Sequence, residues 1–79
     1  MNSNMTINYD APSDTLYIDS CPPYSEQCSN EIEPGVIART NPNDGSIETI
    51  EVMFFKERLE RGKPFAIPVH LDMHSLKSA

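Results

Sequence analysis

Hydrophobic and polar residues alternate near the start of the chain, with the period of two that is typical of β-strands. The apolar positions in this alternation are Met5, Ile7, Tyr9, Leu16 and Ile18. Between them lies the segment 10–14, in which Pro12 fixes one turn dihedral and Asp and Ser side chains can hydrogen-bond nearby backbone amides. The pattern predicts a β-hairpin with strands at residues 5–10 and 15–19.

Two further strands are predicted at residues 35–40 and 46–54. The segment 41–45 between them reads Asn-Pro-Asn-Asp-Gly, a strong turn signal because Asn, Asp and Gly adopt positive φ at low cost. Alternation along 46–54 puts Ile50, Val52 and Phe54 on one face and a second apolar set on the other. That second set is Ile47, Met53 and Phe55. A small sheet cannot easily bury both faces, so the second set is a candidate interaction surface.

A short helix is predicted at residues 56–61, where Glu57 and Arg61 form an i,i+4 pair and Gly62 provides a C-terminal stop. Strict alternation over residues 65–74 then predicts a last strand. Pro68 lies inside it and has no amide proton for the ladder, so we expect an edge strand there and include Pro68 in the candidate interaction surface.

Residues 20–34 are rich in Pro, Ser, Glu, Gln and Asn and show no period, so a long polar loop is predicted there. Local reversals at both hairpins favour antiparallel pairing. The predicted class is α+β, mostly β. We expect one domain over residues 1–79, with about five antiparallel strands in meander-like order and one short helix before the last strand.

The chain has 79 residues, with 12 acidic and 6 basic side chains and a net charge of −6. A domain of this size has a small core and would gain stability from a partner or a second copy. The negative charge argues against direct nucleic-acid binding, and no segment is long and apolar enough for a membrane span. Without a secretory signal the expected compartment is the cytoplasm, where Cys21 and Cys28 should be free thiols.

Two groups of side chains are candidate ligand sites. Asp10 and Asp14 supply too few ligands for a hard cation, and capping of their own turn is the favoured interpretation. His70, Asp72 and His74 share one face of the predicted last strand, and they are weak candidates for a zinc site without an evident fourth ligand. The sequence therefore favours a non-enzymatic role without a cofactor. A small metal-dependent enzyme or sensor built on these three residues is the alternative.

The motifs of the chain resemble a widespread family of small bacterial domains known as domain of unknown function 2283. The resemblance covers about residues 5–55. It rests on the hairpin residues Tyr9, Asp10, Asp14, Leu16, Tyr17 and Ile18, on Pro34-Gly35-Val36-Ile37, and on Asp44-Gly45 with Ile50-Glu51-Val52. Thr49 stands where the family often has Gly or Val. Residues 56–79 form an extension beyond this core.

The resemblance implies a small soluble β-rich cytoplasmic protein of no established activity. It also makes an antitoxin role plausible, because some relatives are encoded beside a small toxin-like gene. The residues themselves favour a protein-interaction or assembly module that acts through strand edges. The expected partners are a second copy of the chain or another protein, with a basic toxin as the most specific version because the chain is acidic.

Overall fold

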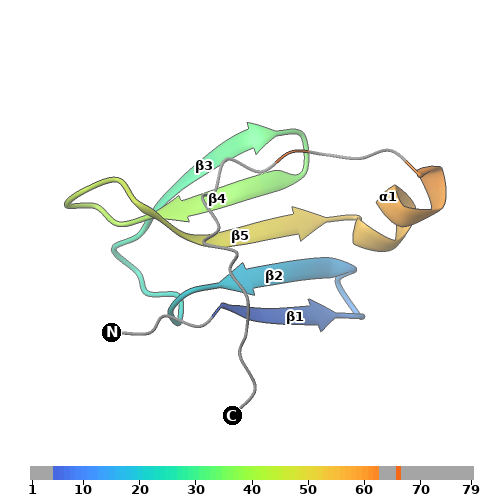
Figure 1. Cartoon of the computed structure of the whole chain (residues 1–79), viewed down its shortest axis with the longest axis horizontal. Helices are drawn as coiled ribbons and strands as arrows, with labels where there is room; N and C mark the ends of the chain where they lie inside the picture. The colour runs from blue at the N-terminus through green and yellow to red at the C-terminus, as the bar shows by residue number, and fades with distance from the viewer. Residues whose placement is uncertain (1–4, 63–65, 67–79) are drawn as a thin grey trace, which may run out of the picture.

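A computed structural model of the chain describes residues 5–62 and Ala66. The described residues form one antiparallel sheet of five strands with one helix at its end (Figure 1). The elements are β1 (Thr6–Asp10), β2 (Thr15–Asp19), β3 (Cys28–Glu33), β4 (Val36–Thr40), β5 (Ile47–Met53) and α1 (Phe55–Arg61). The expectation of a mostly β fold with an antiparallel sheet of five strands and a short helix is confirmed. The predicted last strand over residues 65–74 lies outside the described residues, Ala66 excepted.

The first hairpin forms where the alternation predicts it. Every residue from Thr6 to Asp10 has a partner in β2, from Thr6 opposite Asp19 to Asp10 opposite Thr15. The turn between the strands closes with a hydrogen bond from the Asp14 amide to the Ala11 carbonyl, 3.1 Å long. Asp14 has a φ of 53°, a conformation that Asp tolerates better than most residues.

The prediction of a loop throughout residues 20–34 is wrong, because β3 occupies the second half of that segment. β3 pairs with β4 through the turn Pro34-Gly35, in which Gly35 has a φ of 81°. A type II turn requires positive φ at its third residue, which Gly35 provides, and Pro is common at its second residue. The strand has no apolar period because it is an exposed edge strand, so backbone pairing alone defines it.

The predicted meander order is also wrong, since the strand order is β1-β2-β5-β4-β3. The chain leaves β2 through residues 20–27, crosses to the far edge and returns through β4 to place β5 beside β2. Burial accounts for this order. Leu16 and Ile18 of β2 need apolar neighbours, and β5 supplies them by pairing Val52 with Leu16 and Ile50 with Ile18.

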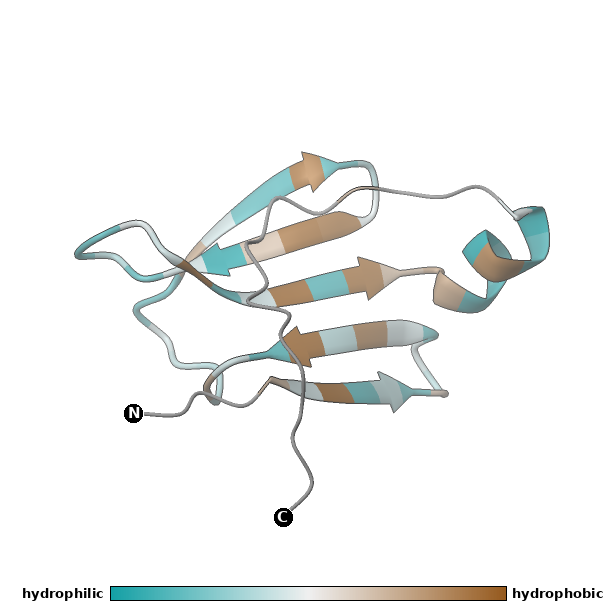
Figure 2. Cartoon of the chain, in the orientation of Figure 1, coloured by the Kyte–Doolittle hydropathy of each residue, from teal (hydrophilic) through white to brown (hydrophobic). Residues whose placement is uncertain are grey.

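One face of the sheet, here called the core face, carries the apolar side chains. Its centre is the fully buried cluster of Val36, Ala38, Ile50 and Val52, and the apolar segments of β4 and β5 are visible side by side in Figure 2. Leu16, Ile18, Ile47 and Phe55 pack against this cluster. The opposite face, here called the polar face, carries the alternate residues of each strand.

The sequence placed Ile47 on the face opposite Ile50, and this prediction is wrong. A β-bulge shifts the register of β5 against β4, so Arg39 pairs with Thr49 whereas Thr40 pairs with Ile47. The extra residue in β5 reverses the alternation, as a bulge does. Ile47 therefore lies on the core face beside Ile50, where it packs against the buried cluster.

Helix α1 lies at the end of the sheet that carries the β1–β2 and β3–β4 turns (Figure 1). Phe54, with a φ of 55°, redirects the chain from β5 into the helix, and Gly62, with a φ of 68°, ends it by accepting the αL conformation of a C-cap. The predicted i,i+4 pair is present, with 2.7 Å between Arg61 and Glu57. Within residues 5–62, no helix has the length and hydrophobicity needed to cross a membrane.

Candidate functional site

The edge strand β1 exposes apolar side chains on the core face. Ile7, Ile18, Ile50 and Ala38 are successive cross-strand partners in one row of the sheet. Ile50 and Ala38 are each 1% exposed, whereas Ile7 is 68% exposed. Tyr9 in the next row is also exposed, as is Met5 just before the strand. We call Met5, Ile7 and Tyr9 the β1 edge surface.

The two edges of the sheet differ in how they are protected against pairing with another strand. Within the described residues β1 pairs only with β2, and β3 pairs only with β4. β3 carries Glu31 and Glu33, and a register shift between them interrupts its ladder. Charges and bulges are the devices by which proteins protect edge strands. β1 has neither device along its length apart from Asp10 at its end, so among the strands that the structure describes it is the edge open to pairing.

Glu48, at the bulge in β5, organises residues 20–27. Its carboxylate accepts hydrogen bonds from the Tyr24 hydroxyl at 2.7 Å, the Gln27 amide at 2.9 Å and the Asn41 amide at 3.1 Å. Its main-chain carbonyl accepts two more, from the amide and hydroxyl of Ser20. Sequence reasoning missed this network, because no spacing pattern relates a bulge in one strand to a loop more than twenty residues earlier.

These hydrogen bonds shift two pKa values in opposite directions. Donation by Gln27, then Tyr24 and Asn41, stabilises the carboxylate and lowers the pKa of Glu48. The same bond to Glu48 raises the pKa of Tyr24 to about 12, since ionisation would destroy the donor and place two negative charges together. At neutral pH the network therefore holds a carboxylate and a neutral phenol.

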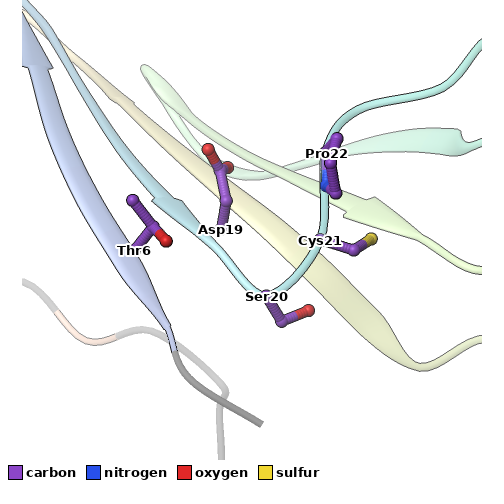
Figure 3. A pocket seen from close by; sticks show the side chains of 5 residues that line it. All are labelled: Thr6, Asp19, Ser20, Cys21 and Pro22. Carbon is purple, nitrogen blue, oxygen red and sulfur yellow. The ribbon is translucent and has the colours of Figure 1, made fainter.

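A pocket of about 280 Å³ lies where β2 leads into residues 20–27. Thr6, Asp19, Ser20, Cys21 and Pro22 line it, and the Asp19 carboxylate and the Cys21 thiol point in different directions (Figure 3). Burial, followed by the nearby Glu48 carboxylate, raises the pKa of the Cys21 thiol. A thiol held protonated is a poor nucleophile, so this geometry gives no support for covalent chemistry at Cys21. Cys21 and Cys28 are both free thiols.

The two aspartates of the first hairpin have different roles. Asp10 caps its own turn, as expected, by accepting hydrogen bonds from the amide and hydroxyl of Ser13. Asp14 instead reaches α1, where its Oδ1 accepts the Lys56 amide at 2.9 Å and the Tyr9 hydroxyl at 2.6 Å. Phe54 supplies no side-chain cap, so an aspartate far away in the sequence caps this helix. Within residues 5–62, no group of three His, Cys, Asp or Glu side chains is arranged to hold a metal.

The β3–β4 turn holds the other side of α1. The Arg58 guanidinium donates to the carbonyls of Pro34 and Met53, and it lies 3.8 Å from the Glu33 carboxylate. A Cβ on Gly35 would lie 3.0 Å from the Arg58 guanidinium, and the φ of 81° at Gly35 strains any other residue. The two hairpin turns thus hold one helix between them.

A family model described as a protein of unknown function (DUF2283) matches residues 6–56. The chain belongs to this family. No curated protein and no solved structure matches the chain. The DUF2283 match ends at Lys56, the residue whose amide Asp14 caps. In this chain Tyr9, Asp14 and Pro34-Gly35 of the resemblance motifs hold the end of the sheet against the first turn of α1.

The structure places the other hairpin residues of the DUF2283 motif in structural positions. Leu16 and Ile18 pack against the buried cluster, and Tyr17 lies half-buried on the polar face opposite Glu51. The Tyr9 ring contacts Phe55 with ring centroids 6.0 Å apart, in a tilted arrangement. Tyr9 thus joins the β1 edge surface to α1.

The predicted interaction residues are dispersed. Ile47 and Phe55 pack against the buried cluster, which leaves them little surface for a partner, and Met53 is half-buried on the polar face. Pro68 and the weak metal candidates His70, Asp72 and His74 lie outside the described residues. The sequence predicts that Ile7 lies in the first strand, but it does not predict that the Ile7 side chain is exposed. The available signal for this exposure was that the strand is the first of the chain.

Replacing Asp14 with Asn tests the cap on α1. Asn tolerates the αL backbone and keeps an acceptor, but it does not titrate. The hydrogen bonds from Tyr9 and then Lys56 lower the pKa of Asp14 below its ordinary value of 3.8. The ionised Asp14 therefore stabilises the folded state fully above pH 3.8, and this stabilisation is lost as the pH falls through the lower pKa of the folded protein. We expect the Lys56 amide resonance to titrate below pH 3.8 in the wild type and not in Asp14→Asn.

Asp10→Asn is the matched control for this titration, because it removes the same charge from the same turn without touching the helix. An unchanged Lys56 titration in Asp14→Asn would show that Asp14 does not cap α1.

Proposed function

We propose that this protein is a small protein-association module whose recognition element is the β1 edge surface. The observation that carries the proposal is Ile7, which is 68% exposed on an edge strand without the protection that β3 has. Strand addition supplies main-chain hydrogen bonds for affinity, and alternate side chains such as Ile7 and Tyr9 supply specificity.

The charge of the chain supports a more specific form of this function. An acidic protein with a net charge of −6 attracts a basic partner at long range, so an antitoxin or an accessory subunit of a larger complex suits it. Salt would weaken such a complex, because it screens charge attraction.

Capture from a lysate of the native host tests the association function. The baits are the wild type, Ile7→Lys and the matched control Ile32→Lys, which places the same charge on an exposed apolar residue of the opposite edge. We expect partners of the wild type, including an untagged copy of the chain, to be lost from Ile7→Lys and retained by Ile32→Lys. If all three baits capture the same proteins in the same amounts, β1 is not the recognition element.

A further inference from the structure

We infer that the partner of the β1 edge is a second copy of this chain, paired antiparallel across a two-fold axis at Asn8. The inference rests on the proposed function and identifies its partner. Two antiparallel edge strands related by a two-fold axis perpendicular to the sheet keep their core faces on the same side. Asn8 is the middle residue of β1, so the axis there pairs all five residues of the strand with their copies.

The side chains of β1 are complementary in this register. Ile7 lies opposite Tyr9 of the second copy, and Tyr9 lies opposite its Ile7. Pairs of an aromatic and a β-branched residue are among the favourable cross-strand pairs of antiparallel sheets. Both residues are exposed on the core face of the isolated chain, so the pairing covers two apolar side chains from each copy.

The polar face of β1 is equally compatible with self-pairing. Asn8 meets its own copy at the axis, where each amide can donate one hydrogen bond and accept another. Asp10, the one charged residue of β1, lies opposite Thr6 rather than another carboxylate. The axis therefore brings no like charges face to face, although each copy carries a net charge of −6.

The opposite edge strand, β3, is not suited to pairing with a second copy of itself. A two-fold pairing of β3 would bring Glu31 and Glu33 of both copies to one interface, and the register shift between them breaks the ladder that a second copy would extend. A second copy is thus specified at β1, and the product is a continuous sheet of two five-stranded halves.

Disulfide trapping tests the axis directly. The background is Cys21→Ser with Cys28→Ser, since both native thiols are free. Directly opposed residues have Cβ atoms about 4.5–5.5 Å apart, which is close to disulfide geometry. We expect Asn8→Cys to form a covalent dimer about tenfold faster or more than Asn30→Cys, because pairing raises the effective thiol concentration. Asn30 is the matched control, an exposed Asn in edge strand β3.

Sedimentation velocity of the wild type accompanies the trapping, and circular dichroism verifies that both cysteine variants fold. We expect a concentration-dependent dimer that tightens with added salt, since salt screens the repulsion between two acidic copies. A strict monomer, or equal trapping at Asn8 and Asn30, overturns the inference. A strict monomer combined with Ile7-dependent capture of another protein leaves the proposed function intact, so the two failures are distinguishable.

Discussion

Replacing Ile50 with Ala is expected to lower the free energy of unfolding by about 2–5 kcal/mol, the usual cost of emptying a buried aliphatic site. Ile50 is 1% exposed and lies in the fully buried cluster with Val36, Ala38 and Val52. The total stability of a domain with this many residues is roughly 4–12 kcal/mol. This substitution therefore removes a large fraction of the total, and part of the variant population is expected to be unfolded near physiological temperature.

Urea unfolding followed by circular dichroism measures this loss, with Ile7→Ala and Ile50→Val as controls. Ile7 is in the same row of the sheet as Ile50 but is 68% exposed, so Ile7→Ala should change stability by less than about 0.5 kcal/mol in the monomer. Ile50→Val should cost about 0.5–1.5 kcal/mol. Equal losses for the Ile7 and Ile50 alanine variants would show that Ile7 serves the core and is not free for a partner.

The apolar residues of each strand explain whether the sequence predicts it. β2, β4 and β5 carry the buried cluster and the apolar residues packed on it, so selection for burial leaves a readable pattern in them. β3 contributes to the sheet through its backbone hydrogen bonds. Its side chains, in the order Cys-Ser-Asn-Glu-Ile-Glu, are mostly exposed to solvent and do not pack in the core. Hydrophobic periodicity reports apolar side chains rather than backbone pairing. Edge strand β3 has no such alternation and reads as a loop, whereas edge strand β1 keeps Ile7 and Tyr9 at alternate positions and is predicted although it is exposed.

Alternation also fails where the backbone departs from regular pairing. The faces of Ile50 and Val52 were predicted correctly, whereas the bulge beside Glu48 moved Ile47 to the core face. A bulge is defined by the pairing of two strands, because two residues of one strand lie opposite one residue of the other. The sequence of a single strand therefore does not reveal a bulge. The inserted residue explains why Ile47 shares a face with Ile50, whereas Met53 stays on the polar face.

The candidate site was predictable only where its contacts are local. The self-capping of Asp10 follows from residues three positions apart, which the turn chemistry identifies. The contact from Asp14 to Lys56 joins residues 42 positions apart, and it exists because β5 delivers α1 to the hairpin. The exposure of Ile7 likewise depends on β1 being an edge, which follows from the strand order and from no local motif.

Replacing Glu48 with Gln is expected to lower the pKa of Tyr24 from about 12 towards its ordinary value of 10.0. The amide oxygen of Gln still accepts from the phenol, but the charge that opposes tyrosinate formation is gone. Carbon-13 NMR of labelled tyrosines resolves Tyr24 from Tyr9 and Tyr17 during an alkaline titration. Glu60→Gln is the matched control, since it removes one carboxylate from an exposed position on α1.

The hydrogen bonds of Glu48 also predict the pH range in which the wild type is more stable than Glu48→Gln. The lowered pKa of Glu48 gives a contribution that is present above 4.5 and is lost as the pH falls through the folded value. The raised pKa of Tyr24 gives a second contribution to stability, which is fully present below pH 10.0 and is lost as the pH rises towards about 12. The difference in Tm between wild type and Glu48→Gln should therefore be greatest near neutral pH and shrink at both extremes. A difference that does not vary with pH would mean that Glu48 acts through packing and not through its charge.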